Sequence, residues 1–192
     1  IIQHIHKYSP YTIDGLKIEI IMKRKSVLVT GGIGFIGSNL VKHLTELNYF
    51  VVILDKKTYS SNLSNLKKIN KKKYKLFLID INNAKAVFKI LKKYKPISVF
   101  NLAAETHVDR SIDNPEIFVK SNINGVVVLL EQIRKYIKQN RNIKFIHIST
   151  DEVYGDLPKK KVSLEGDPYR PSSPYAASKA SSDHLIRSYF RT

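Results

Sequence analysis

A glycine-rich segment near the start of the chain constrains the fold more than any other feature of the sequence. Residues 26–30 (Ser-Val-Leu-Val-Thr) form a short apolar run, and Gly31, Gly34 and Gly37 follow it at intervals of three residues. Glycines at this spacing permit a tight turn, a close approach of the backbone to a pyrophosphate and close packing of the next helix. A helix that begins here directs its free N–H groups toward the phosphate. We therefore predict a dinucleotide-binding strand, turn and helix; the alternative is a loop that merely contains glycines.

Four further apolar runs predict the rest of a parallel sheet. Residues 50–55, 75–80, 98–103 and 144–150 are rich in Val, Ile, Leu and Phe with little alternation, as buried parallel strands require. The segments between and after them carry apolar residues at helical spacing, which predicts helices over 36–47, 84–91, 122–137 and 174–189. Strands that alternate with helices indicate an α/β fold, here a Rossmann-like doubly wound parallel sheet with helices on both faces.

The only methionine suggests a boundary. Met22 opens a segment typical of a natural start, so we expect residues 1–21 to be a leader outside the fold and residues 22–192 to form an NAD-binding Rossmann domain. The chain stops at Arg191-Thr192, directly after a predicted helix, where a doubly wound sheet would continue with another strand. We expect the front part of a longer protein, without its C-terminal substrate domain.

Composition limits the partners and the compartment. The 192 residues carry a formal charge of +17 and include no cysteine, which excludes disulfides and thiolate metal sites. The lysines are dispersed and no aromatic residues interleave with them, so a solvated basic surface is favoured over nucleic-acid binding. No apolar stretch approaches the roughly 20 residues that span a bilayer. We expect a cytoplasmic protein with no nucleic-acid and no membrane partner.

Carboxylates at the ends of two predicted strands point to a particular cofactor. Asp55 stands 18 residues after Gly37, where a carboxylate meets the hydroxyls of the adenosine ribose and repels a 2′-phosphate. NAD is therefore favoured over NADP, although Lys56 and Lys57 weaken that exclusion. Asp80 reaches either the adenine amino group or, as an N-cap, the helix that follows it.

A tyrosine, a lysine, a threonine and two carboxylates form the predicted catalytic set. Tyr175 and Lys179 stand four residues apart and share one helix face. The ordinary pKa of tyrosine is about 10, so a tyrosine base needs a nearby positive charge that lowers this pKa. Thr150 ends the fifth predicted strand, and Asp151 and Glu152 follow it; neighbouring carboxylates can hold opposite protonation states. The simpler alternatives are a surface tyrosine beside a solvated lysine and an acidic turn.

Three histidines are candidate metal ligands or bases. His107, His147 and His184 have no ligand partner at a suitable spacing, so we predict no metal. His147 lies within a predicted strand and is expected to pack in the core.

Longer motifs point to a family. The segments GGIGFIGS, NLAAETHVDRSI, HISTDEVYGD and SPYAASKASSDHLIRSYFRT resemble the extended short-chain dehydrogenase/reductase superfamily, within it the NAD-dependent epimerase/dehydratase family, and more narrowly the dTDP-glucose 4,6-dehydratases. The likeness runs from about Met22 to Thr192. The Asp-Glu pair after Thr150 separates these dehydratases from sister sugar epimerases, which eliminate no water.

The resemblance implies a reaction and a role for each catalytic residue. Tyr175, with Lys179 beside it, would take the proton of the glucose 4-hydroxyl while NAD accepts the hydride from C4. Glu152 would then remove the C5 proton, and Asp151 would protonate the departing 6-hydroxyl. The hydride would return to C6, giving dTDP-4-keto-6-deoxy-glucose without net consumption of NAD.

The resemblance also implies which residues contact the ligands. The pyrophosphate would contact Phe35 and Ile36, and the ribose would contact the residues from Asp55 to Thr58. The sugar would contact Thr106 and Thr150. The remaining cofactor contacts would come from the ends of the third and fourth strands and from a later helix: Asp80, Ile81, Leu102, Ala103, Ala104, Glu105, Thr106 and Ser121.

Other functions stay open at this point. A UDP-sugar epimerase, dehydratase or decarboxylase of the same superfamily shares most of these motifs, and a catalytically incomplete NAD-binding fragment shares the cofactor motif alone. The resemblance implies a nucleotide-sugar substrate, dTDP-glucose, and a homodimer of the full-length protein. The apolar stripes of residues 122–138 and 174–189 are the candidate dimer surfaces.

Overall fold

The computed structural model describes residues 25–138, 142–158 and 161–192. The expected leader (residues 1–21) and the boundary at Met22 lie outside the described residues. In the described part of the chain, no helix is long and apolar enough to cross a membrane.

Five parallel strands form the central sheet. Along the sheet they run β3 (Tyr74–Leu78), β2 (Phe50–Asp55), β1 (Ser26–Thr30), β4 (Ser98–Asn101) and β5 (Lys144–His147). The chain therefore adds strands first on one side of β1 and then on the other, which is the doubly wound arrangement that the alternating pattern predicted. In sheets of this kind, the reversal of strand order marks the place at the carboxyl ends of the strands where ligands bind.

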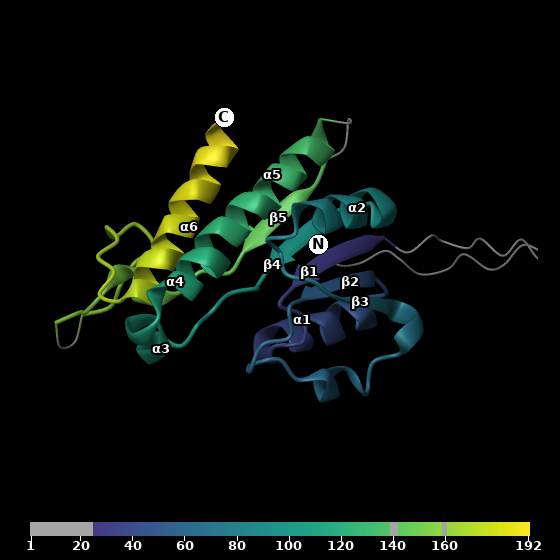
Figure 1. Cartoon of the computed structure of the whole chain (residues 1–192), viewed down its shortest axis with the longest axis horizontal. Coiled ribbons are helices and arrows are strands. Elements are labelled where there is room, and N and C mark those ends of the chain that lie inside the picture. Colours follow the sequence, from purple (N-terminus) through teal and green to yellow (C-terminus); the bar gives the residue numbers. More distant parts are fainter. Residues whose placement is uncertain (1–24, 139–141, 159–160) are drawn as a thin grey trace, which may run out of the picture.

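Helices cover both faces of the sheet, as expected. On one face Leu28, Val52 and Val99 pack against α2 (Ala84–Tyr94) and α5 (Gly125–Ile137). On the other face the alternate strand residues pack against α1 (Phe35–Glu46) and the short helical turn η1 (Leu63–Leu66). The fourth long helix, α6 (Pro174–Arg191), packs beside α5 and extends the first face (Figure 1).

Local sequence signals define the helix ends. Pro174 occupies the first turn of α6, and the Ser173 hydroxyl accepts a hydrogen bond from the Ala176 N–H at 3.0 Å. Helix α2 begins after Asn83, whose side chain accepts from the Ala86 N–H at 3.1 Å. It ends at Lys95, which adopts φ of 48° just before Pro96.

The strands on the two edges differ from the prediction. Only β1, β2 and β4 are largely buried, whereas β3 and β5 lie at the edges of the described sheet and are partly exposed. The strands expected over 75–80, 98–103 and 144–150 end two or three residues early, at Leu78, Asn101 and His147. After β3 the pairing continues for one more backbone hydrogen bond, from the Ile79 N–H to the Asp55 carbonyl at 2.9 Å. It then gives way to a turn in which the Asp80 carboxylate accepts the Asn82 N–H at 2.9 Å.

Several short helical segments were not predicted. The helix expected from residue 122 begins at Gly125, and it is preceded by α3 (Val108–Asp113), α4 (Pro115–Phe118) and a π-helical turn, η3 (Val119–Asn124). Two 3₁₀ turns, η2 (Lys71–Lys73) and η4 (Asp151–Tyr154), complete the described secondary structure. The segment η4 holds the two carboxylates of the predicted catalytic set.

Candidate active site

A cavity of about 660 Å³ lies at the carboxyl ends of the strands. Most residues predicted from the sequence line it, although they come from segments far apart in the chain: Gly31, Gly34, Phe35, Ile36, Gly37, Asp55, Lys56, Thr58, Asp80, Ile81, Leu102, Ala103, Ala104, Thr106, Ser121, Thr150, Asp151, Tyr175 and Lys179. Lys57, Glu105 and Glu152 are not among the lining residues. Six lining residues were not predicted: Leu54, Ser60, Ser61, Ile79, Ile148 and Ser149.

The glycine-rich turn forms the floor of the cavity between β1 and α1. Gly31 adopts φ of 68°, and a Cβ there would lie 2.9 Å from the Ala103 backbone nitrogen. A Cβ on Gly37 would overlap the Gly31 carbonyl oxygen. Helix α1 begins beside this turn with no side-chain cap, so its first N–H groups are directed at the cavity. These features form a cradle that a phosphate fits and a side chain would fill.

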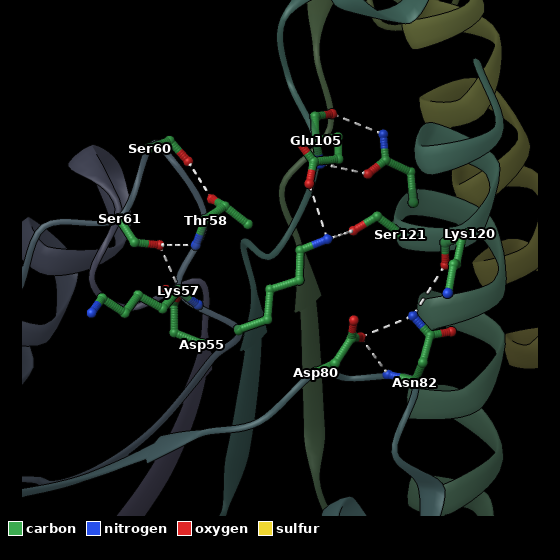
Figure 2. A network of polar contacts seen from close by, with 12 residues as sticks. Asp55, Lys57, Thr58, Ser60, Ser61, Asp80, Asn82, Glu105, Lys120 and Ser121 are labelled. Atoms are coloured by element: carbon green, nitrogen blue, oxygen red, sulfur yellow. Dashed lines mark hydrogen bonds and ion pairs between the residues drawn. The ribbon is translucent and has the colours of Figure 1, made fainter. Parts of the chain in front are cut away.

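Asp55 ends β2 with its carboxylate held by the turn that follows. Its Oδ1 accepts hydrogen bonds from the Lys57 N–H and the Ser61 hydroxyl, each at 2.8 Å. Its Oδ2 accepts from the Ile33 N–H at 3.2 Å, which ties the carboxylate to the glycine-rich turn. Figure 2 shows Asp55 below Thr58 and Ser61 on one side of the site. The carboxylate is therefore fixed beside the cradle, where a ribose would lie.

Asp80 lines the cavity and does not cap α2. Its carboxylate accepts from both the backbone and side-chain nitrogens of Asn82, each at 2.9 Å (Figure 2). The alternative of an N-cap role is wrong, because Asn83 caps the helix instead. The adenine contact of Asp80 stays a prediction.

An ion pair joins the two sides of the crevice. The Lys56 ammonium lies 2.9 Å from the Glu105 carboxylate and donates to the Ser121 hydroxyl at 3.3 Å. The Glu105 backbone is fixed by Asn122, which accepts from its N–H at 2.8 Å and donates to its carbonyl at 2.9 Å. Asn122 also donates to the Ser178 hydroxyl at 2.9 Å, so the network reaches α6.

Tyr175 lies in the first turn of α6 and is nearly buried. Its backbone N–H donates to the Ser111 hydroxyl at 3.0 Å, and its ring packs edge-on against Phe118. Burial raises the pKa of its phenol, a side-chain hydrogen bond with Thr150 lowers it, and the charges of Glu152 and Asp151 raise it further. The net direction is upward, so the protein groups alone favour the neutral phenol.

Lys179 shares the face of α6 with Tyr175, as predicted, but its amine is held elsewhere. The Lys179 nitrogen donates to the Ile148 carbonyl at 2.5 Å and lies 3.3 Å from the His147 ring. Burial lowers the pKa of Lys179 to about 8, while the charge of Asp183 acts in the opposite direction. The lysine is therefore close to its own titration at neutral pH.

The two predicted catalytic carboxylates begin the turn η4. The Thr150 hydroxyl accepts from the Glu152 N–H at 3.3 Å and donates to the Asp151 carboxylate at 3.4 Å. Both carboxylates are exposed, and Asp151 lines the cavity. Thr150 therefore contacts Tyr175 and orients the start of η4 at the same time.

The histidines differ in their surroundings. The His147 side chain is 7% exposed and lies in β5, as expected for a core position, but it also contacts Asn101 and Lys179. His107 and His184 are exposed, and His184 packs against Tyr169. Among residues 25–138, 142–158 and 161–192, no group of three histidine or acidic side chains is placed to hold a metal ion.

A doubly wound parallel sheet, a GxxGxxG turn and a Tyr-x-x-x-Lys pair on one cavity define a Rossmann-type protein of the short-chain dehydrogenase/reductase class. Residues 28–192 match the family described as GDP-mannose 4,6 dehydratase, and the chain belongs to that family. This match confirms the resemblance read from the motifs.

Individual relatives narrow the likeness. The dTDP-glucose 4,6-dehydratase of Salmonella typhimurium is 46% identical over 182 residues, covering 86% of this chain and 50% of that protein. The crystal structure of a Streptomyces venezuelae dTDP-glucose 4,6-dehydratase with NAD bound matches with a TM-score of 0.79 at 37% identity, covering 87% of this chain and 52% of that one. The Thermus thermophilus UDP-glucose 4-epimerase in complex with NAD gives 0.78 at 33% identity, covering 86% and 51%. The chain thus spans about half the length of the curated relatives it matches.

Proposed function

We propose that this chain binds NAD and carries the proton-transfer residues of a dTDP-glucose 4,6-dehydratase. The observation that carries the proposal is the meeting of Thr150, Asp151 and Tyr175 in one cavity with the glycine-rich turn. The relatives described above, several of them dTDP-glucose 4,6-dehydratases, support the same reading.

The residues present fit a dinucleotide. The cradle at Gly31 and Gly37 has room for a phosphate but none for a side chain, and the Asp55 carboxylate stands beside it for a ribose. Asp80 and Ser121 line the further parts of the same cavity. When bound, the nicotinamide would supply a reversible hydride acceptor for the sugar carbon.

Each proton of the reaction has a candidate residue. Tyr175 takes the proton of the 4-hydroxyl, and Thr150, which is bonded to Tyr175, holds the same oxygen. The ketone formed at C4 acidifies the C5 proton, which Glu152 removes. Asp151 gives a proton to the 6-hydroxyl, which departs as water. Glu152 then returns its proton to C5.

The proton balance distinguishes this reaction from an epimerisation. The product keeps its ketone at C4, so Tyr175 finishes each turnover with a proton that it must lose. Asp151 finishes each turnover without the proton that it gave to the leaving hydroxyl. In an epimerase the tyrosine returns its proton to the sugar, and no carboxylate pair is needed. The exposed Asp151 and Glu152 therefore favour dehydration over the epimerase alternative.

One experiment tests the proposal in two stages. Calorimetry with NAD⁺ measures binding, and incubation with dTDP-glucose followed by mass spectrometry measures turnover. A product lighter by one water supports the dehydratase. A product of the same mass in which the sugar has a different configuration supports an epimerase. Binding without any product supports an NAD-binding chain that is catalytically incomplete. Absence of NAD binding by a chain that is folded by circular dichroism overturns the proposal.

We also propose a homodimer and a cytoplasmic location, the latter supported by the absence of cysteine. The structure changes the expected dimer surface, because the apolar stripe of α5, including Leu129 and Ile133, is buried in the core. Phe190 on α6 is 92% exposed and is the better candidate for a contact between copies. Sedimentation velocity of the wild type and of Phe190→Ser checks this assignment.

A further inference from the structure

A chain of hydrogen bonds crosses three neighbouring strand ends beneath the cavity. The Ala103 N–H donates to the Thr30 hydroxyl at 3.1 Å. The Thr30 hydroxyl in turn donates to the Asn101 side-chain oxygen at 2.6 Å. The Asn101 side-chain nitrogen lies 2.9 Å from Nδ1 of His147. Thr30 and Asn101 are fully buried, so water does not compete for these bonds.

This chain of bonds determines where the His147 ring carries its proton. Because the Asn101 oxygen is occupied by Thr30, its NH₂ group faces the ring and Nδ1 must accept. The single proton of the neutral ring therefore resides on Nε2. Burial and the charge of Lys179 lower the pKa of His147 to about 3, which keeps the ring neutral across the working range of pH. His147 thus presents a fixed N–H group.

That N–H group faces the Lys179 amine. Nε2 lies 3.3 Å from the Lys179 nitrogen and 3.8 Å from the Asp183 carboxylate. An ammonium has no lone pair and cannot accept from Nε2–H, whereas a neutral amine can accept from it and still donate to the Ile148 carbonyl.

Asp183 is the acidic group that opposes this effect. Its second oxygen already accepts from Ser149 at 2.5 Å and from the Tyr169 hydroxyl at 3.0 Å. Arg187 lies over the Tyr169 ring and places a further positive charge on this side. The negative charge of Asp183 is therefore partly compensated by the two hydroxyl groups that donate to it and by the nearby Arg187, so it stabilises the Lys179 ammonium less.

We propose that His147 is a positioning residue for Lys179: Thr30 and Asn101 hold it in the Nε2–H form, and that N–H favours the neutral amine over the ammonium. The inference rests on the proposed function, in which Tyr175 must lose one proton per turnover. A neutral amine on the same helix as Tyr175 has the lone pair that an ammonium lacks, so it can take up a proton released in the site. His147 acts through Lys179 and touches no reacting atom.

The wild-type protein provides the first test, and it needs no turnover. Nitrogen NMR of ¹⁵N-histidine-labelled protein should show that the His147 ring is neutral and carries its proton on Nε2. This state should persist from about pH 5 to about pH 9. Carbon NMR of lysine labelled at Cε should show one resonance titrating near pH 8, identified because it is missing in Lys179→Met. A His147 ring protonated at Nδ1 would overturn the inference.

Thr30→Val tests the mechanism without changing any charge. Without the hydroxyl, the Asn101 amide is free to turn its oxygen to Nδ1, so Nε2 becomes an acceptor for the ammonium. The pKa of Lys179 should rise by about one pH unit, roughly tenfold in proton affinity. The control His43→Asn, on the exposed side of α1, should leave that pKa unchanged. If the His147 ring keeps its proton on Nε2 in a folded Thr30→Val protein, then Thr30 does not determine the tautomer and the proposal is contradicted.

Asn101→Asp provides an independent variant. Its carboxylate can only accept, so it draws the ring proton to Nδ1 and leaves Nε2 free to accept from Lys179. If the ring proton of His147 moves to Nδ1 and the pKa of Lys179 does not rise, the inference is overturned. If this buried substitution prevents folding, the spectra of the wild type and of Thr30→Val still test whether the Nε2–H form favours the neutral amine of Lys179. Because none of these measurements uses NAD or a sugar, failure of the proposed dehydratase activity is recognised separately by the binding and turnover assays.

Discussion

The Lys56 ammonium and the Glu105 carboxylate form an ion pair at 2.9 Å that connects the segments after β2 and β4. The Glu105 side chain is 8% exposed, so its charge has little access to water and depends on Lys56 for compensation. Lys56 directly follows Asp55, the residue proposed to hold the ribose. The lysine next to this proposed ribose contact is thus paired with a carboxylate on the opposite side of the cavity.

This commitment gives a prediction for cofactor choice. Glu105→Gln should release Lys56 to approach a ribose 2′-phosphate, so the affinity for NADP relative to NAD should rise roughly tenfold. Calorimetry with both cofactors measures the ratio. Lys57→Gln is the control, because Lys57 follows in sequence but does not line the cavity, and it should leave the ratio unchanged. Equal changes in affinity for both cofactors upon Glu105→Gln would contradict the prediction.

The glycine-rich turn should tolerate no added carbon at Gly37. In Gly37→Ala the new Cβ overlaps the Gly31 carbonyl oxygen, so the turn must open. We expect a loss of about 2 kcal/mol in the free energy of unfolding, together with the loss of NAD binding. Gly166→Ala is a matched control, because a Cβ there meets nothing within 4 Å. Urea unfolding and calorimetry measure the two effects, and similar behaviour of both variants would count against the described turn.

Glu152 is expected to act after the first oxidation. Glu152→Gln, in a chain that turns over dTDP-glucose, should leave NAD binding intact and slow the exchange of the C5 hydrogen with deuterated solvent by at least roughly a hundredfold. Mass spectrometry of recovered sugar follows the exchange. Asp156→Asn is the control, because Asp156 lies just beyond the η4 turn and is exposed. Exchange at the wild-type rate in Glu152→Gln would remove Glu152 from the mechanism.

Lys179 should reduce the stability of the fold at neutral pH. Its pKa is about 8 in the folded protein and the ordinary pKa of lysine is 10.5, so between these two pH values the unfolded chain binds more protons. Stability therefore rises with pH over this interval, and the cost of the buried charge is fully present below pH 8. Lys179→Met should stabilise the protein by about 1–3 kcal/mol at pH 7, with the advantage vanishing above pH 10.5.

Urea unfolding at several pH values measures this difference. Lys135→Met, an exposed substitution on α5, is the control and should show no pH-dependent gain. A constant difference between Lys179→Met and the wild type from pH 7 to about pH 10.5 would mean that the lysine carries no burial cost.

Local chemistry explains which parts of the fold could be predicted. The limits of β1 and β2 agree with the sequence prediction to the residue, because both strands lie inside the sheet, have apolar middles and are followed by residues that break the strand pattern. Pro174 and the glycines of the turn likewise act through their own backbone preferences. The lengths of β3, β4 and β5 were overestimated, because their apolar residues continue into segments that line the cavity, such as Ile79, Leu102 and Ile148.

Contacts between distant segments could not be predicted. Asn101 and His147 are 46 residues apart, and nothing in either segment indicates that the two side chains meet. The pairing of Lys56 with Glu105 likewise depends on the order of the strands. Ser61 was a missed site residue with a usable signal, since a serine shortly after Asp55 is a natural donor to its carboxylate. Glu105 was predicted for its motif, and the structure places it as a support behind the cavity lining.

Asn122 has a consequence for how ligands affect one another. It bonds to the Glu105 backbone in the crevice and to Ser178 of α6, and its own carbonyl accepts from Ser182 at 2.6 Å. Helix α6 also carries Tyr175 and Lys179. A dinucleotide that orders the backbone before Asn122 therefore restricts the helix that must be in place for a sugar. The conformational entropy lost on forming the second complex should then be smaller, so we expect the two ligands to bind with positive cooperativity beyond any effect of direct contact between them.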